Sequence, residues 1–355
     1  MQKGKYELLI KNLELDNVVI FGLSTRAEAC YDWFVTHFPN VKIIGFIPDS
    51  STEKQSFCGV SVLSVDDIKQ KQEVVIIYAE RDVSNIENLK IKHGLKNDFY
   101  IFYYVKPFFD TGDRSYPEQE IRDLYQLNDT ETNMFLENFF LAKQHGWSLL
   151  LSLDSLDWIA KYNKKYWDMD DNDLSIYDEL TFLDCGAYTG DSLEDFAKQY
   201  GDKLKYAYAL EADNTKQESL KNTALILGIA DSTQIIMKGV NDVAGDFFVE
   251  NIGSTTGKVV EDGEHSAQTT RIDDLSVQPI GKLCIKMDVE GFEMPALKGA
   301  AEAIKEFKPE MAICIYHQTS DIFEIPKYIR SLCLEYRFII RGGVHTVCYC
   351  STSRF

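Results

Sequence analysis

The sequence predicts an α/β protein with two domains joined by a helical segment. Short apolar stretches typical of strands alternate with segments of helical periodicity, a pattern that predicts parallel sheets covered by helices. A chain of 355 residues is also too long for one ordinary core. We expect a smaller Rossmann-like domain at residues 1–115, a helical bridge at 116–178 and a larger domain at 179–355.

The composition is that of a globular protein with a large excess of acidic residues. Hydrophobic residues make up 45% of the chain and charged residues 26%, and the formal net charge is −19. A surface that follows nucleic-acid phosphates needs a basic stripe, which the sequence lacks, so we expect no nucleic-acid partner. The 8 cysteines form no C-x-x-C pair, which predicts reduced thiols and neither a disulfide framework nor a zinc site.

The sequence predicts neither a membrane span nor a signal peptide. No apolar run approaches the roughly 18 residues that cross a bilayer. The first residues, MQKGKYELLIKNLELDN, lack the apolar segment of a signal peptide. We therefore expect a cytoplasmic protein.

The first domain is predicted to be Rossmann-like but degenerate. We expect parallel strands at these apolar segments: Val18–Phe21, VKIIGFIPD ending on Asp49, EVVIIYA and Phe99–Val105. A dinucleotide fold has G-x-G-x-x-G after its first strand, whereas Gly22–Ala27 contains a single glycine, so a pyrophosphate site is not supported. Asp49 either holds a ribose or caps a turn. Three roles stay open for this domain: binding a nucleotide-sugar, binding a carrier-linked glycan, or forming a homodimer.

The bridge at 116–178 is predicted to be helical and is rich in aromatic residues. The segments EQEIRDLYQLN and ETNMFLENFFLAKQHGW carry apolar residues three and four apart, as a helix facing a core requires. Core packing and a sugar-stacking platform are both compatible with the aromatic set, which comprises Phe135, Phe139, Phe140, Trp147, Trp158, Tyr162, Tyr166 and Trp167.

The stretch FLDCGAYTGDS, residues 182–192, predicts a small-molecule site in the second domain. An apolar strand ends there near Asp184, and the residues from Ser192 onward have helical spacing. Gly186 and Gly190 lie in the turn between them, where glycine permits positive φ or the close approach of a ligand. The free N–H groups and the dipole of the following helix point into the same crevice.

An acidic residue follows the next predicted strand. Glu211 comes directly after Tyr206–Leu210, and about 20 residues separate such an acid from the glycine turn in folds where it grips both hydroxyls of a ribose. A glycine turn followed by a ribose acid fits a nucleoside ligand.

Later strands are predicted to end on further polar residues. A third strand is expected to end near Gly239, just before Asn241 and Asp242, and a closing antiparallel pair is expected at YRFIIRGG and HTVCYCS. The carboxyl ends of parallel strands open on one edge of the sheet, where ligands bind. We therefore expect five strand-end side chains to lie on this edge: Asp184, Glu211, Asp242, Asp288 and His317.

From about Thr181 to the C-terminus, the sequence resembles the FkbM family of S-adenosylmethionine-dependent methyltransferases. The resemblance is carried by FLDCGAYTGDS, E-A-D-N-T…L-K-N, TTRIDDL and above all IKMDVEGFEMPALKGA. The family usually reads I-K-I-D-V-E-G-x-E in the last motif, and Ile285–Glu293 match it nearly throughout. The resemblance implies a seven-stranded, Rossmann-like class I methyltransferase fold and O-methylation, often of sugars in secondary metabolites or surface polysaccharides.

The resemblance also implies where the cofactor, S-adenosyl-L-methionine, binds. The glycine turn is expected to hold its amino-acid end, Glu211 its ribose, and Asp184 is expected near its positive charges. The predicted cofactor-binding residues are Asp184, Gly186, Ala187, Gly190, Ser192, Glu211, Ala212, Asn241, Asp242 and Asp288.

Three residues are predicted to be catalytic. The protein has to align the acceptor oxygen with an already activated methyl group, and a sugar hydroxyl benefits from a base. His317 is the first candidate because it ends a strand and its ordinary pKa is ~6.5. Asp288 and Glu290 are rival bases or acceptor-positioning carboxylates. With Asp242 they are also candidates for Mg²⁺, but their spacing is not diagnostic, so we assign no metal ligands. Lys286 is expected to be structural and to point away from Asp288.

The sequence-based hypothesis is therefore an enzyme that methylates a hydroxyl of a small-molecule or carrier-linked saccharide. A non-catalytic scaffold that binds S-adenosylmethionine or a nucleotide-sugar is the alternative from another class. An RNA methyltransferase is a lesser alternative, because the fold alone does not fix the acceptor and the acidity disfavours RNA.

Overall fold

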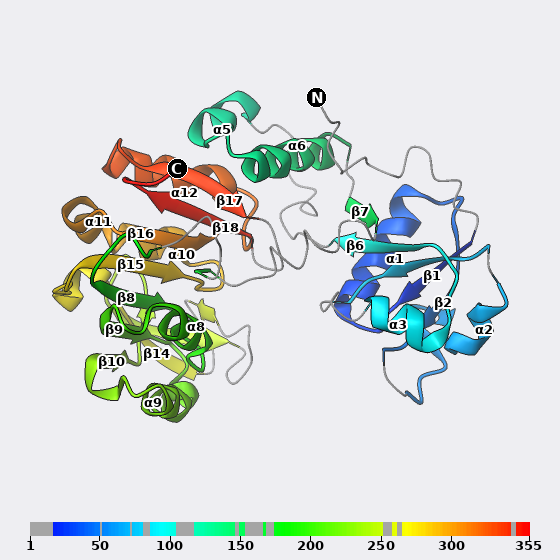
Figure 1. The fold of residues 1–355 in the computed structure, drawn as a ribbon, viewed down its shortest axis with the longest axis horizontal. Helices are drawn as coiled ribbons and strands as arrows, with labels where there is room; N and C mark the ends of the chain where they lie inside the picture. The colour runs from blue at the N-terminus through cyan, green and yellow to red at the C-terminus, as the bar shows by residue number, and fades with distance from the viewer. Residues whose placement is uncertain are drawn as a thin grey trace. The chain divides into compact units, whose positions relative to one another are not determined.

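The structure of the protein is a computed structural model, shown as a ribbon in Figure 1. The description covers these residues: 17–49, 52–71, 73–80, 86–103, 117–145, 149–152, 166–167, 174–250, 258–260, 265–341 and 346–355. The chain divides into two compact units. Unit 1 comprises Met1–Tyr116 and Leu136–Asn163, and unit 2 comprises Pro117–Phe135 and Lys164–Phe355.

Unit 1 is built on a five-stranded sheet in the order β2-β1-β5-β6-β7. Its strands are β1 (Asn17–Phe21), β2 (Lys42–Ile47), β5 (Val75–Tyr78), β6 (Phe99–Tyr103) and β7 (Leu149–Ser152). The first four pair in parallel, as the sequence predicts, whereas β7 runs antiparallel to β6. The expectation of helix throughout 116–178 is therefore wrong at β7, where the run LLLS completes the edge of a sheet instead.

The helices and the hairpin of unit 1 lie between these strands in the chain. They are α1 (Thr25–His37), α2 (Val65–Lys69), α3 (Ile86–His93) and the hairpin β3 (Ser56–Phe57) with β4 (Val60–Ser61). Ser64 caps α2, since its hydroxyl accepts a hydrogen bond from the amide of Asp67 while its own amide donates to that carboxylate.

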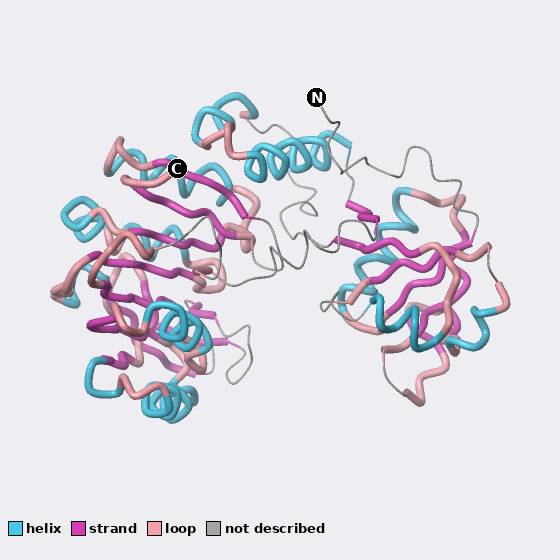
Figure 2. The backbone as a smooth tube through the Cα atoms, viewed as in Figure 1, coloured by secondary structure: helices cyan, strands magenta, loops and turns pink. Residues whose placement is uncertain are grey.

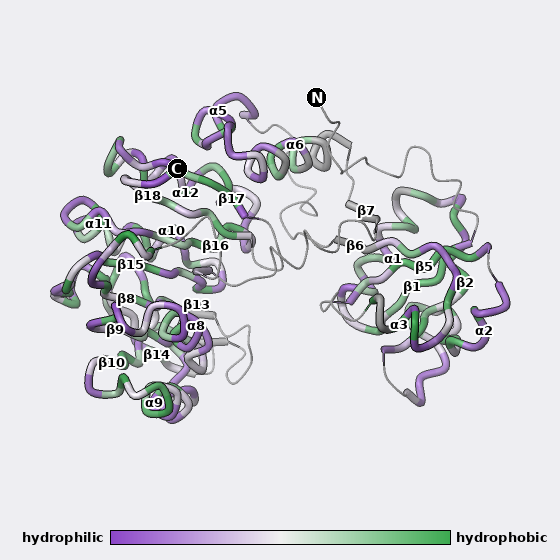
Figure 3. The backbone as a smooth tube through the Cα atoms, in the orientation of Figure 1, coloured by the Kyte–Doolittle hydropathy of each residue, from purple (hydrophilic) through white to green (hydrophobic). Residues whose placement is uncertain are grey.

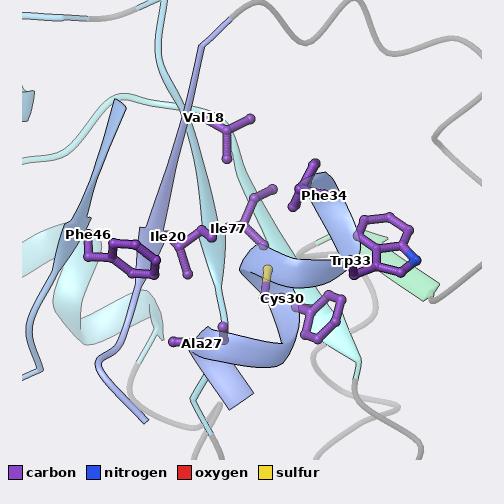
Figure 4. Packing of buried hydrophobic residues seen from close by; sticks show 10 residues of the cluster. Val18, Ile20, Ala27, Cys30, Trp33, Phe34, Phe46 and Ile77 are labelled. Atoms are coloured by element: carbon purple, nitrogen blue, oxygen red, sulfur yellow. The ribbon is translucent and has the colours of Figure 1, made fainter. Parts of the chain in front are cut away.

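The core of unit 1 lies between β1 and α1. Val18 and Ile20 point from one face of β1 toward the apolar side of α1, where Ala27 and Cys30 are fully buried (Figure 4). Alternate residues of a strand share one face, which explains why these positions are apolar. Figure 3 shows β1 and β5 as hydrophobic and α2 as hydrophilic, the contrast expected of a central strand and a surface helix.

Two helices precede β7 in the chain, α5 (Glu118–Leu124) and α6 (Thr130–His145). Asp129 caps α6 by accepting from the amide of Thr132, and it also pairs with the guanidinium of Arg341 at 2.6 Å. The division between the two units falls within α6. Of the aromatic set in this part of the chain, the buried members are Phe135, Phe139, Phe140, Tyr166 and Trp167. Trp147, Trp158 and Tyr162 lie outside the described residues.

Unit 2 contains a seven-stranded sheet in the order β10-β9-β8-β15-β16-β18-β17. Figure 2 draws its strands in magenta and the helices of the unit in cyan. The strands are β8 (Leu180–Cys185), β9 (Leu204–Leu210), β10 (Thr233–Ile236), β15 (Lys282–Met287), β16 (Glu310–Cys314), β17 (Arg337–Arg341) and β18 (Val347–Ser351). The first five of the sheet are parallel, and β18 is inserted antiparallel between β16 and β17. This order confirms the predicted class I methyltransferase fold.

Further helices of unit 2, besides α5, follow the parallel strands. They are α8 (Asp191–Tyr200), α9 (Gln217–Ile226), α10 (Glu293–Lys298), α11 (Ala301–Phe307) and α12 (Asp321–Leu332), with short 3₁₀ turns η5 (Asn214–Lys216), η6 (Ala230–Ser232) and η7 (Ile272–Leu275). The helix α8 packs on α9, and α12 contacts both α10 and α11. Within the described part of the chain, no helix has the length and apolar composition needed to cross a bilayer.

The structure corrects the prediction for the third strand of unit 2. The strand of the main sheet, β10, ends at Ile236, and β11 (Gly239–Val240) belongs to a separate four-stranded sheet of order β11-β14-β12-β13. Its other strands are β12 (Gly245–Glu250), β13 (Lys258–Val260) and β14 (His265–Thr270). Asp242 therefore follows a strand of this small sheet and not the edge of the main sheet. Lys238 turns the chain between the two sheets, its amide bonded to the carbonyl of Ile236.

Candidate functional site

The turn between β8 and α8 has the backbone conformation that its glycines were predicted to allow. Gly186 has φ +82° and Gly190 has φ +91°, both in the region that side chains disfavour. A Cβ on Gly186 would lie 1.9 Å from the carbonyl oxygen of Asp288, so only glycine fits there. The amides of Gly186 and Ala187 both donate to the carbonyl of Leu210, which ties the turn to the end of β9.

A buried ion pair lies directly inside this turn. Asp184 and Lys286 are 0% and 2% exposed, and the lysine Nζ lies 3.1 Å from Oδ1 of the aspartate. The same Nζ donates to the carbonyl of Gly186 at 2.7 Å. Burial raises the pKa of Asp184 to about 6, although the charge of Lys286 opposes this rise. Asp184 is thus enclosed by protein, and its contact with a cofactor stays a prediction.

Glu211 is fixed at the end of β9 by two backbone amides. Its Oε2 accepts from the amide of Tyr188 at 2.7 Å, and its Oε1 accepts from the amide of Asp213 at 2.8 Å. Burial raises the pKa of Glu211, and the two amides counteract that rise. Each oxygen keeps a second lone pair, so the carboxylate retains the capacity to accept two hydroxyl groups. The structure therefore joins Glu211 to the glycine turn through Tyr188.

The other predicted cofactor residues differ in accessibility. Ala187 is fully buried, Ser192 and Asn241 are nearly so, Ala212 is half-buried and Asp242 is exposed. The side-chain oxygen of Asn241 accepts from the amide of Asp242 at 2.8 Å, which shapes the loop after β11.

The first unit has a turn at the corresponding place, but its own carboxylate fills it. Gly22 follows β1 with φ +121°, and a Cβ there would lie 2.0 Å from Oε1 of Glu80. The amides of Leu23 and Ser24, at the start of α1, donate to the same carboxylate. This helix N-terminus, where a dinucleotide fold binds pyrophosphate, is therefore occupied by Glu80.

In the second unit, three carboxylates surround one imidazole at the ends of β15 and β16. The Nε2 of His317 lies 3.3 Å from Oε2 of Glu290 and 3.6 Å from Oδ1 of Asp288, and its Nδ1 lies 2.8 Å from Oε1 of Glu293. The exposed fractions of these side chains are 5% for His317, 14% for Asp288, 26% for Glu290 and 1% for Glu293. We call these four residues the Asp288 cluster. The predicted catalytic residues are thus brought together.

His317 was selected as a base for its ordinary pKa, but its surroundings change that pKa. Burial acts to lower its pKa, but the carboxylates of Glu290, Glu293 and Asp288 outweigh that effect and raise it to about 10. The expectation of an ordinary pKa near ~6.5 is therefore wrong. This raised pKa favours the protonated imidazole at neutral pH, so a carboxylate of the cluster is better suited to accept a proton first.

Asp288 is oriented by two tyrosines, Tyr166, which the sequence analysis named only in the aromatic set of the bridge, and Tyr316, which it did not name. The hydroxyl of Tyr166 donates to Oδ2 at 2.6 Å, and the hydroxyl of Tyr316 donates to Oδ1 at 2.9 Å. Glu290 has φ +54°, an unfavourable conformation for a residue with a side chain, which is typical of positions held for function. The sequence analysis also did not select Glu293 as a site residue. Glu293 is the last residue of the motif Ile285–Glu293, so the resemblance of this motif to the family could have indicated it.

The expectation that Lys286 points away from Asp288 is wrong. The Lys286 ammonium lies 5.2 Å from the ring centre of Tyr166, and that same tyrosine holds the carboxylate of Asp288. Residues i and i+2 of a strand lie on one face, which explains the arrangement.

The Asp288 cluster also has the composition of a metal site. One ligand atom each from Asp288, Glu293 and His317 lie within 4.8 Å of one another. Asp242, a candidate for Mg²⁺ in the sequence analysis, is not part of this group.

The fold is that of a class I methyltransferase. Residues 184–340 match the family described as methyltransferase FkbM domain. The C-terminal half of the chain is therefore an FkbM methyltransferase domain, and the protein is a methyltransferase enzyme. No curated protein matches the sequence.

One solved structure supports the fold, and a second is more weakly similar to the chain. The crystal structure of the methyltransferase FkbM from Methylobacillus flagellatus KT matches with a TM-score of 0.60 and 19% identity, covering 96% of this chain and 92% of that chain. A putative rRNA-methylase from Clostridium thermocellum matches with a TM-score of 0.33 and 10% identity, covering 51% of this chain and 92% of that chain. The similarity to the structure from Methylobacillus flagellatus KT shows that this chain shares the fold of that protein.

Proposed function

We propose that unit 2 binds S-adenosyl-L-methionine and transfers its methyl group to a hydroxyl of a saccharide or glycoconjugate. The observation that carries the proposal is the Glu211 carboxylate, which the amides of Tyr188 and Asp213 hold beside the glycine turn with lone pairs to spare. These two acceptor oxygens suit the two ribose hydroxyls of a nucleoside cofactor, which would donate to them. When bound, the cofactor supplies a methyl group already activated on a sulfonium.

In this proposal the Asp288 cluster receives the acceptor hydroxyl. Asp288 adjoins the glycine turn, because its amide donates to the carbonyl of Cys185 and its carbonyl faces Gly186. With the cofactor bound, its sulfonium would supply the methyl group to the acceptor oxygen and keep the electron pair of the broken bond, and Glu290 would accept the hydroxyl proton and pass it to water. Glu290 is suited to this step because it is the most exposed member of the cluster, at 26%.

The acceptor class rests on chemistry and on family resemblance. A cluster of carboxylates hydrogen-bonds readily to sugar hydroxyls, and the net charge of −19 disfavours RNA. We propose a place in surface-polysaccharide or secondary-metabolite biosynthesis and a cytoplasmic location. All eight cysteines are free thiols, as a reducing compartment favours.

Calorimetric titration with S-adenosylhomocysteine tests the cofactor. We expect the wild type to bind and Glu211→Ala to lose at least ~10-fold in affinity, because two hydroxyl contacts are each worth about 1 kcal/mol or more. Glu218→Ala is the matched control, since Glu218 is an exposed glutamate on α9. Thermal unfolding shows whether Glu211→Ala folds, and Glu211→Gln replaces it if it does not. Absence of binding by the wild type contradicts the proposal and favours the scaffold alternative.

Transfer of labelled methyl groups tests the acceptor. We expect incorporation into nucleotide-sugars or carrier-linked glycans and none into bulk RNA. Retention of bulk RNA on a filter at low salt, with methyl transfer to it, contradicts the saccharide proposal and favours the RNA alternative.

A further inference from the structure

Tyr188 lies in the glycine turn of unit 2 in a conformation that side chains disfavour. Its φ is +47°, and it directly follows Ala187 in a turn that the amide of Gly190 closes by donating to the carbonyl of Ala187 at 2.7 Å. A turn position with positive φ is usually occupied by glycine, asparagine or aspartate, because a larger side chain raises its free energy. A tyrosine at this position therefore calls for a contact that compensates for the unfavourable backbone.

The left-handed conformation of Tyr188 directs its backbone amide at the predicted ribose acid. The amide donates to Oε2 of Glu211 at 2.7 Å, while the amide of Asp213 donates to Oε1 at 2.8 Å. The angle φ describes rotation about the bond between the amide nitrogen and Cα, so a change in φ turns this N–H relative to the chain that follows. The orientation in which Glu211 presents its remaining lone pairs thus depends on the conformation of Tyr188.

The side chain of Lys216 supplies a compensating contact. Its Nζ lies over the ring of Tyr188, 4.4 Å from the ring centre, and Lys216 is buried. A cation at this distance from an aromatic face is attracted to it, and the attraction is stronger where water is excluded. The amide of Lys216 donates to the carbonyl of Asp213 at 3.0 Å. The contact of Lys216 with Tyr188 therefore joins the two turns whose amides hold the two oxygens of Glu211.

We propose that Tyr188 is a positioning residue for cofactor binding and that Lys216 keeps it in its left-handed conformation. This inference rests on the proposed function, in which Glu211 accepts the two ribose hydroxyls of S-adenosyl-L-methionine. The ring of Tyr188 makes the contact with the cation, and Lys216 affects the cofactor only through Tyr188 and Glu211. Loss of the contact lets residue 188 return to the favoured region of negative φ, which withdraws an amide from the carboxylate.

Calorimetric titration of the full-length protein with S-adenosylhomocysteine tests the proposal. Lys216→Met and Tyr188→Leu are each expected to weaken binding by at least ~10-fold, because Glu211 loses a hydrogen bond to its charged group. The conservative variant Tyr188→Phe keeps the ring and is expected to lose no more than about 3-fold. Lys221→Met is the matched control, since Lys221 is an exposed lysine on α9 that pairs with Glu218, and it is expected to bind as the wild type does.

A second variant of Tyr188 separates its conformational role from general damage to the structure. Glycine adopts positive φ without support, so we expect Tyr188→Gly to stay within about 3-fold of the wild-type affinity. The double variant Lys216→Met, Tyr188→Gly is expected to bind as Tyr188→Gly does, because the cation no longer has a conformation to maintain. A lysine that only stabilises the fold would weaken binding equally in both backgrounds. Thermal unfolding shows which variants are folded.

Two results overturn the proposal: wild-type affinity in folded Lys216→Met, or a double variant weakened as much as Lys216→Met alone. If Lys216→Met does not fold, wild-type affinity in folded Tyr188→Leu has the same meaning. Binding by the wild type together with unchanged binding by these variants overturns the role of Tyr188 and Lys216 and leaves the proposed function intact. Absence of binding by the wild type overturns the proposed function, and the role of Tyr188 and Lys216 with it.

Discussion

The two units contain the same local motif, a strand that ends in a glycine and is followed by a helix, with opposite outcomes. In unit 1, the carboxylate of Glu80 lies against Gly22 and takes the amides at the start of α1. In unit 2, the buried pair of Asp184 and Lys286 supports the turn from inside, and Glu211 holds it from the side. In both turns a carboxylate accepts a backbone amide, but Glu80 lies against the glycine itself, whereas Glu211 lies beside the turn and Gly186 faces the backbone of Asp288.

The largest expected effect on stability comes from replacing the glycine of each turn by alanine. Gly186→Ala places Cβ against the backbone oxygen of Asp288 at positive φ, so we expect more than ~3 kcal/mol of destabilisation and loss of cofactor binding. Gly22→Ala meets the flexible end of Glu80, so we expect only about 1–2 kcal/mol, from its positive φ. Urea unfolding and calorimetry measure both. Equal effects at the two positions contradict the comparison.

The second effect concerns the ion pair that unit 2 has inside its turn. Lys286→Met leaves Asp184 buried without its partner, so we expect about 3–5 kcal/mol of destabilisation at neutral pH. The double variant Asp184→Asn, Lys286→Met removes both charges and is expected to recover part of this loss. A double variant as unstable as the single one shows that packing, and not the uncompensated charge, explains the effect.

The smallest effect is expected in unit 1. Burial raises the pKa of half-buried Glu80, and the charge of Asp49 adds to the rise, so the folded state binds its proton more tightly than the unfolded chain. The stability contribution is therefore greatest at pH values below the unfolded pKa and decreases as the pH rises through the folded pKa. Glu80→Gln removes this dependence and is expected to stabilise the protein by less than about 0.5 kcal/mol at neutral pH, since solvent screens the charge.

Comparison of unfolding curves for the wild type and Glu80→Gln between acidic and neutral pH measures this effect. A wild type that gains stability relative to the variant as the pH rises contradicts the assignment. The same variant tests whether the charge of Glu80 is what prevents a dinucleotide from binding at the Gly22 turn. NAD binding by Glu80→Gln but not by the wild type shows that it is.

Much of the fold was predictable because the signals are local. The apolar strands β1 and β8 and the glycines after them are contiguous in the sequence, and the FkbM motif at Ile285–Glu293 placed Asp288 and Glu290 at the end of β15. Strand β7 was missed because LLLS has no periodicity that separates a strand from a buried helix. The small sheet that contains β11 was missed because its pairing partners lie far along the chain.

The site was less predictable than the fold, because its chemistry depends on distant contacts. Tyr166 lies 122 residues from Asp288 in sequence, and nothing local to either residue indicates their hydrogen bond. The pKa of His317 was misjudged for the same reason, since three carboxylates from another loop and helix determine it. The sequence was sufficient to predict that Asp288, Glu290 and His317 lie at one edge of the sheet. The protonation of these side chains depends on their neighbours in the tertiary structure.

The position of β18 has a consequence for how the chain is made. This strand comes after β17 in sequence but lies between β16 and β17 in the sheet. During synthesis β17 therefore emerges from the ribosome with no strand to pair with, and it has to wait until Ser351 has been added. The strand β17, which is buried in the folded protein, is exposed to chaperones and to other nascent chains during that interval, so the interval before β18 is added is open to misassembly.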